Sequence, residues 1–278
     1  MVLLLQLLFS FAVTVVYAVI SHISLSVASG LILIGIFLAA FIVFIIVIVL
    51  IIIIIIFATE KLDKKKMYKH NILNIMGEYI FNFLFRVKLV VTGKENLPKN
   101  NRFVIYANHI EYTDPIYIKQ IFKKNPVAYV GKESLFKIFL IKNLLSGAGC
   151  IPISRNVDRS ALQSILESIK IVKNGQPMGV FPEGTRTYSN DLLDFKPGAF
   201  KVAVKSQADI VPVCLYNMHG LLENKSLKRH VAYIHILPII EYEAYKEFNT
   251  ITIAEMVRTK INNQLDIFKE NIPESKTK

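Results

Sequence analysis

The stretch that decides the fold runs from Arg102 to Pro115 and reads Arg-Phe-Val-Ile-Tyr-Ala-Asn-His-Ile-Glu-Tyr-Thr-Asp-Pro. Its first half is apolar and rich in β-branched and aromatic residues, which predicts a short buried strand over 102–107. Asp114 followed by Pro115 is a common helix start, with aspartate as the cap and proline in the first turn. A strand that passes through a polar turn into a helix is typical of an α/β domain.

The same alternation continues on both sides of this stretch. We expect further strands at 87–92, 127–130, 178–181, 210–215 and 231–237, and helices at 115–122, 160–174 and 253–268. Short apolar strands that alternate with helices predict an α/β domain over residues 87–278.

The N-terminal part of the chain has a different composition. The first 59 residues contain no Asp, Glu, Lys or Arg, so the whole net charge of +12 belongs to the rest. Residues 31–58 form an unbroken apolar run, and residues 2–20 are nearly as apolar. Because roughly 20 helical residues cross a bilayer core of about 30 Å, we predict that residues 1–60 form a hydrophobic helical hairpin that anchors the chain. The hairpin either spans the bilayer or dips into one leaflet.

Residues 61–86 form a basic juxtamembrane segment. It carries lysines at positions 61, 64, 65, 66 and 69. Positive residues beside a span stay on the cytoplasmic side, so we expect the catalytic domain on the cytoplasmic side of the cell membrane. Apolar residues recur at helical spacing over 67–86, which predicts an amphipathic helix. That helix either lies on the membrane surface or packs against the domain.

The positive charge and the cysteines narrow the class of protein. A basic chain can meet nucleic acid, anionic lipid or an anionic substrate. The apolar run, together with the absence of an aromatic-and-basic recognition motif, favours membrane phospholipid and argues against nucleic acid. Cys150 and Cys214 lie in apolar surroundings without zinc-site spacing, so we interpret both as reduced core thiols.

The first polar cluster follows the strand over 102–107 directly. His109 lies in the turn, where the Asp114 carboxylate can reach its ring. A carboxylate holds an imidazole in one tautomer and makes it a better base for an alcohol that attacks a carbonyl. A plain helix cap is the other interpretation of Asp114. A thiol mechanism that pairs Cys150 with His109 is disfavoured, because it leaves the second cluster unused.

The second polar cluster, 181–187, reads Phe-Pro-Glu-Gly-Thr-Arg-Thr and also follows an apolar strand. Gly184 lets the backbone turn and expose N–H groups, which suit phosphate oxygens. Arg186 offers a planar fork for bidentate phosphate binding. Glu183 could accept a hydrogen bond from a glycerol hydroxyl or brace Arg186. A β-turn with a surface salt bridge is the alternative.

Four blocks in this chain resemble the motifs of glycerolipid acyltransferases of the 1-acylglycerol-3-phosphate acyltransferase type. His109 and Asp114 are similar to the family's His-x4-Asp motif. Residues 181–187 resemble its Phe-Pro-Glu-Gly-Thr-Arg-Ser motif, with Thr in the last place. Residues 149–155 resemble its arginine-bearing block, and 210–213 its Val-Pro-Val block. The four occur in the family's order, and the likeness covers roughly residues 87–268.

This resemblance implies a mixed central sheet flanked by helices and a role for each motif residue. His109 would be the general base on the free hydroxyl of lysophosphatidic acid, and Asp114 would orient it. The acceptor's phosphate and glycerol would be held by Glu183, Gly184, Thr185, Arg186 and Arg155. Lys132 would add positive charge to the site or face solvent. The acyl donor would be a thioester of acyl carrier protein or coenzyme A, with no metal or other cofactor, and the product would be phosphatidic acid.

Two departures from the family pattern bear on the acceptor. Glu111 stands where a serine is usual, and Ser154 where an acidic residue is common. The acceptor could therefore be glycerol 3-phosphate, another lysophospholipid or a glycolipid. A non-catalytic membrane adaptor that keeps the fold is a further alternative. It is disfavoured by four intact motif residues, His109, Asp114, Glu183 and Arg186.

Overall fold

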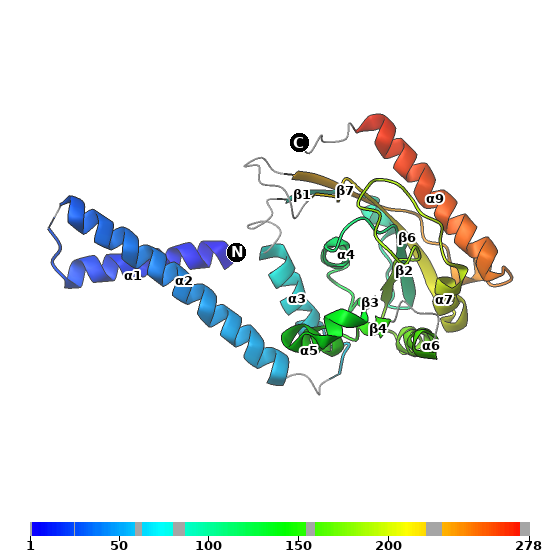
Figure 1. Cartoon of the computed structure of the whole chain (residues 1–278), viewed down its shortest axis with the longest axis horizontal. Coiled ribbons are helices and arrows are strands. Elements are labelled where there is room, and N and C mark those ends of the chain that lie inside the picture. Colours follow the sequence, from blue (N-terminus) through cyan, green and yellow to red (C-terminus); the bar gives the residue numbers. More distant parts are fainter. Residues whose placement is uncertain are drawn as a thin grey trace. The chain divides into compact units, whose positions relative to one another are not determined.

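The computed structural model describes residues 2–24, 26–58, 63–79, 87–153, 159–220 and 230–272. The chain divides into two compact units, Met1–Thr59 and Glu60–Lys278. Figure 1 shows an all-helical first unit and a second unit built around a sheet.

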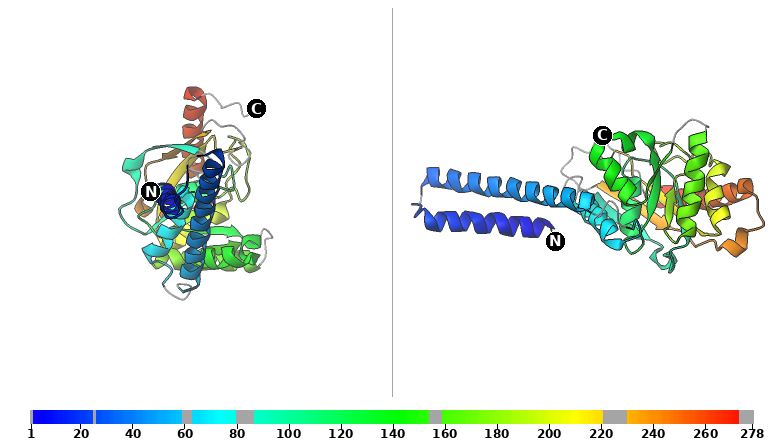
Figure 2. Two further views of the ribbon diagram at one scale, coloured as in Figure 1. Left: turned by 90° about the vertical axis from the view of Figure 1, so that its left-hand side faces the viewer. Right: turned by 90° about the horizontal axis from the view of Figure 1, so that it is seen from below.

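The first unit is a hairpin of two helices, α1 (Val2–Ile20) and α2 (Val27–Ala58), which run side by side (Figure 2). The Gln6 side chain donates a hydrogen bond to the Phe41 carbonyl (3.2 Å), and the rings of Phe9 and Phe44 lie 5.4 Å apart. Most other side chains face outward and are apolar. By length and composition both helices could cross a membrane. The predicted hydrophobic hairpin is therefore confirmed, and its depth in the bilayer stays a prediction.

Helix α3 (Met67–Tyr79) belongs to the second unit and packs against α4 (Asp114–Ile121). His70 is completely buried between them, and its Nδ1 lies 2.7 Å from the Lys119 ammonium. The sequence left open whether this helix lies on the membrane surface or packs against the domain. The first turns of α3 pack against the domain. Residues 80–86 lie outside the described part of the chain.

The second unit contains a seven-stranded sheet in the order β1-β7-β6-β2-β5-β3-β4. Its strands are β1 (Val87–Thr92), β2 (Phe103–Ala107), β3 (Ala128–Lys132), β4 (Ile151–Ile153), β5 (Met178–Val180), β6 (Asp209–Tyr216) and β7 (His230–Ile236). Neighbouring strands are parallel except for the antiparallel pair β6 and β7. The expected mixed sheet is confirmed.

Helices cover both faces of this sheet (Figure 1). They are α4, α5 (Phe139–Gly147), α6 (Arg159–Lys173), α7 (Lys201–Ser206), α8 (Tyr242–Tyr245) and α9 (Thr250–Asn271), with short 3-10 turns η2 (Lys94–Asn96), η3 (Glu133–Lys137) and η4 (Pro197–Phe200). Successive side chains of a strand point to opposite faces. Along the buried β2, Phe103 and Ile105 therefore pack with α4, while Val104 and Tyr106 pack on the opposite face with α7 and α9.

Strand β4 and helix α5 are among the elements that were not expected from the sequence, as are the short helices α7 and α8. Strand β4 has three residues, which is too short to display a period of two. Helix α5 is short and mostly apolar, and it follows η3 almost directly. Both lie between β3 and α6, where we expected only the arginine-bearing block.

Candidate active site

The turn between β2 and α4 is held together by one carboxylate oxygen. Helix α4 begins at Asp114 itself, so the expectation that Asp114 is the residue before the helix is wrong by one position. Its Oδ2 accepts hydrogen bonds from the backbone N–H groups of Ile110 (2.7 Å) and Glu111 (2.8 Å). Asp114 therefore reaches back into the turn that carries His109.

The same oxygen contacts the ring of His109, because Nδ1 lies 2.8 Å from Asp114 Oδ2. The Asp114 side chain is fully buried, whereas that of His109 is 17% exposed. Burial raises the pKa of Asp114, and the hydrogen bonds from His109 and the turn oppose this increase. An ionised Asp114 accepts the proton on Nδ1, which leaves Nε2 as the basic nitrogen.

The ring of His109 is also fixed from one face. Phe181, the residue that follows β5, stacks on it with centroids 4.1 Å apart and an interplanar angle of 22°. Because a stacked ring and a hydrogen-bonded carboxylate restrict both torsions of the imidazole, its orientation is set before any ligand binds.

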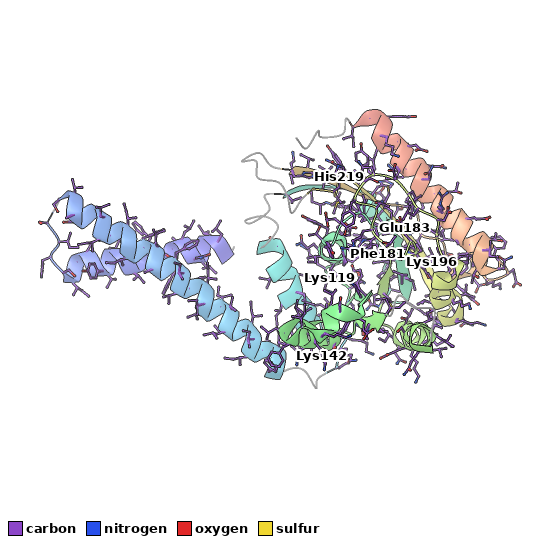
Figure 3. All side chains as sticks on the ribbon, viewed as in Figure 1. Lys119, Lys142, Phe181, Glu183, Lys196 and His219 are labelled. Carbon is purple, nitrogen blue, oxygen red and sulfur yellow. The ribbon has the colours of Figure 1, made fainter. Side chains whose placement is uncertain are left out.

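Glu183 supports the backbone of His109. Its Oε1 accepts a hydrogen bond from the His109 N–H (2.7 Å), and its Oε2 accepts one from the Leu193 N–H (3.1 Å). The side chain is 3% exposed, and burial raises the pKa of Glu183 to about 7. This contact differs from both roles expected for Glu183. It joins the second polar cluster, whose Phe181 and Glu183 are labelled in Figure 3, to the first.

Backbone hydrogen bonds complete this junction. The N–H of Thr187 donates to the His109 carbonyl (3.0 Å), and that of Tyr188 donates to the Ile110 carbonyl (3.2 Å). The two clusters meet because β2 and β5 are parallel neighbours, whose carboxyl ends lie at the same edge of the sheet.

Gly184 occupies a position that only glycine fits well. Its φ is +71°, and a Cβ added there would lie 2.7 Å from Nζ of Lys196. Lys196 also donates its backbone N–H to the Pro182 carbonyl (2.9 Å). The structure thus adds a lysine beside the glycine turn, which the sequence analysis did not select.

Arg186 is held by one aromatic ring from the first cluster and by one that directly follows the second. Its guanidinium carbon lies 3.3 Å from the ring centre of Tyr112 and 5.2 Å from that of Tyr188. Such stacking holds a cation while leaving its N–H groups able to donate. One guanidinium nitrogen, Nη1, is buried without a hydrogen-bond partner. Arg186 can therefore bind an anion next to His109.

Comparison with known proteins identifies the family of this site. The profile of a family described as Acyltransferase matches residues 88–216, which include both clusters. The 1-acyl-sn-glycerol-3-phosphate acyltransferase of Borreliella burgdorferi is 33% identical over 192 residues, or 67% of this chain and 75% of that protein. The chain belongs to the 1-acyl-sn-glycerol-3-phosphate acyltransferase family.

Two further matches agree with this assignment. A probable 1-acyl-sn-glycerol-3-phosphate acyltransferase of Mycoplasma pneumoniae is 33% identical over 150 residues, which cover 52% of this chain and 56% of that protein. The crystal structure of the acyltransferase PlsC from Thermotoga maritima matches with a TM-score of 0.63 and 22% identity, over 77% of this chain and 87% of that one. The latter likeness shows the acyltransferase fold.

Two of the remaining predicted site residues of this acyltransferase are exposed to solvent. Thr185 is exposed in the glycine turn, and Lys132 is exposed at the end of β3. The pKa of Tyr112 is lowered mainly by Arg186, then by Tyr188, with a smaller effect of the Lys132 charge, so Lys132 acts on the same region. Arg155 lies outside the described residues.

Asn108 directly precedes His109, and no role was expected for it from the sequence. Its buried amide donates to the Leu215 carbonyl (2.9 Å) and accepts from the Leu215 N–H (2.8 Å). The side chain thereby ties the end of β2 to β6. An asparagine next to the histidine was its only signal.

The structure disfavours the thiol alternative. Cys150 and Cys214 are free thiols, and burial raises the pKa of both. A nucleophilic cysteine needs a lowered pKa. Among the described residues, no group of three or more His, Cys, Asp or Glu is placed to hold a metal ion. The expectation that the acyltransferase needs no metal or other cofactor stays a prediction.

Proposed function

We propose that this protein transfers an acyl chain from a thioester to the free hydroxyl of 1-acylglycerol 3-phosphate and so makes phosphatidic acid. The observation that carries the proposal is the contact of His109 with Asp114, on a turn that Glu183 joins to the loop bearing Arg186. The same acceptor is supported by the relatives, which are a 1-acyl-sn-glycerol-3-phosphate acyltransferase and a probable one.

In the proposed reaction, Nε2 of His109 takes the proton of the glycerol hydroxyl while its oxygen attacks the thioester carbonyl. A C–O bond forms, and the C–S bond then breaks. The thiolate that leaves takes the proton back from the imidazolium. Asp114 stabilises the imidazolium during this exchange, because its Oδ2 accepts the Nδ1 proton.

The phosphate of the acceptor would be bound by the second cluster. A phosphate monoester carries close to two negative charges at neutral pH, since its second pKa is about 6. Arg186 can donate two parallel hydrogen bonds to it, and the turn at Gly184 and Thr185 can add backbone N–H groups. Lys132 and Arg155 would contribute further positive charge. These assignments explain why the cation and the base share one junction.

The donor and the location belong to the same proposal. A thioester of acyl carrier protein or coenzyme A is the donor, with no metal or other cofactor. The protein acts at the cell membrane, with the catalytic unit on the cytoplasmic side. Exposed lysines at 64, 65 and 66 follow the apolar helices, and this order favours cytoplasmic placement of the residues after them.

The test uses the whole chain purified in detergent, with lysophosphatidic acid and each thioester, and follows phosphatidic acid. The parent should form product. His109→Ala should lower kcat by about 10²- to 10⁴-fold, the usual contribution of a positioned base. His235→Ala is the matched control. His235 forms a hydrogen bond with Thr92 on β1, so its removal should leave kcat unchanged.

Other acceptors enter the same assay. If glycerol 3-phosphate, another lysophospholipid or a glycolipid is consumed faster than lysophosphatidic acid, the assigned acceptor is wrong while the reaction class stands. If His109→Ala is as active as the parent, the assignment of the base is wrong.

A further inference from the structure

The catalytic unit exposes several large apolar side chains between η3 and the first turn of α5. Leu135 of η3 is 37% exposed, Ile138 between the two elements is 50% exposed, and Phe139 and Leu140 of α5 are 70% and 38% exposed. We name these four residues the η3–α5 patch. Phe139 is the most exposed of the large apolar side chains described in the second unit.

These four residues lie within six consecutive positions of the chain, 135–140, and each is more than a third exposed. Water-soluble domains rarely leave adjacent large apolar side chains uncovered unless the surface meets a partner or a membrane.

Lysines surround the patch. Lys132 precedes it, Lys137 lies within it and Lys142 follows it, and all three are exposed. Figure 3 labels Lys142 on α5. Glu133 pairs with Lys137 at 3.2 Å, with both side chains more than half exposed. These four charged groups leave the segment with a net charge of +2.

A second group of lysines lies near the other end of α5. The Lys69 ammonium of α3 donates to the carbonyl of Gly147, the last residue of α5 (3.5 Å). The exposed lysines at 64, 65 and 66 come just before α3. The positive charge thus extends from the patch to the start of α3.

We propose that the η3–α5 patch inserts into the surface of an anionic lipid bilayer, with Phe139 below the head groups and the lysines among them. Interfacial segments combine apolar side chains with a lysine rim in this way. The core of a protein–protein interface is instead depleted of lysine. The same chain carries two helices long and apolar enough to cross a membrane, so a bilayer is a surface that the catalytic unit can meet.

The absence of tryptophan from the sequence allows a direct test. Phe139→Trp in the whole chain gives the protein a single tryptophan, which is read in vesicles of anionic phospholipid. Its emission should be shifted to shorter wavelength, and acyl chains carrying bromine should quench it. Phe248→Trp is the matched control, because Phe248 is 45% exposed between α8 and α9. Its emission should be the same with and without bromine.

Two outcomes would overturn the proposal. Quenching of the tryptophan at 139 that is no stronger than at 248 would show that the patch does not reach the acyl chains. A short-wavelength emission that bromine does not quench would place the side chain against protein instead. Ile138→Trp repeats the test at a neighbouring position if the first variant does not fold.

The role of charge is tested in the Phe139→Trp protein by adding Lys137→Gln and Lys142→Gln. Quenching should fall in anionic vesicles and stay unchanged in zwitterionic ones. Lys260→Gln, on the exposed side of α9, should change neither. Equal quenching with and without the two lysines would remove anionic lipid from the proposal. Because no readout uses acyl transfer, failure here and failure of the proposed function are distinguishable.

Discussion

At the scale of single residues, one oxygen atom organises the candidate active site. Oδ2 of Asp114 accepts hydrogen bonds from His109 and from two backbone N–H groups, while Oδ1 is buried without a partner. One side chain therefore both orients the imidazole of His109 and closes the turn that carries it. The two functions can be separated by substitution.

Asp114→Asn should separate them. The amide oxygen can replace Oδ2 and keep the turn, with the NH₂ group in the place of Oδ1. The negative charge that stabilises the imidazolium is lost, so kcat should fall by about 10²- to 10⁴-fold with little change in the melting temperature. Asp114→Ala removes the acceptor of the turn as well and should also unfold at lower temperature. Equal melting temperatures of the two variants would contradict this division of roles.

Glu183 should make stability depend on pH. Its pKa is raised from 4.5 to about 7 by burial, so the folded protein binds the proton more tightly than the unfolded chain does. The stability that this group contributes is fully present below about pH 4.5 and is lost as the pH rises to about 7. The melting temperature of the parent minus that of Glu183→Gln should fall across this range and then level off. A difference in melting temperature that is constant with pH would show that the pKa of Glu183 is not raised in the folded protein.

At the scale of secondary-structure elements, the site is made by adjacent strand ends. The loops after β2 and β5 exchange backbone hydrogen bonds through Thr187 and Tyr188, and Glu183 adds its carboxylate to the junction. A change of backbone geometry in the loop after β5 should therefore be transmitted to His109.

Gly184→Ala tests this coupling. A left-handed conformation costs a residue with a Cβ roughly 1 kcal/mol, and the new Cβ would displace Lys196. We expect lower thermal stability and a higher KM for the phosphate-bearing acceptor. Gly198→Ala is the control, since a Cβ there meets no atom within 4 Å. Identical kinetics of the two variants would show that the turn does not shape the site.

At the scale of the whole molecule, the sequence is divided between an uncharged helical hairpin and a basic catalytic unit. In the proposed function, the apolar helices hold the protein at the lipid phase in which a lysophospholipid acceptor resides. The charge asymmetry predicts on which side of that phase the chemistry takes place.

The predicted side can be measured in cells. A fluorescent reporter that folds only in the cytoplasm, fused after Lys278, should fluoresce in the membrane fraction. Replacing the lysines at 64, 65 and 66 by glutamine should reduce this signal, because fewer positive charges then keep the segment after α2 on the cytoplasmic side. A full-length fusion that reaches the membrane without fluorescence would place the catalytic unit on the other side.

Much of this protein follows from its sequence alone. The apolar helices follow from composition, and α4 and most strands from short-range patterns. The contact of His109 with Asp114 follows from a spacing of five residues within one turn. In each case the deciding interactions join residues close together in the chain, so local backbone geometry determines them.

The rest was decided only by tertiary structure. Glu183 supports the backbone of His109 from 74 residues away, Asn108 ties β2 to β6 across 107 residues, and two tyrosines from different loops hold Arg186. These contacts depend on which strands become neighbours in the sheet. That order results from packing the apolar faces of the whole domain together, and no periodicity in a single segment encodes it.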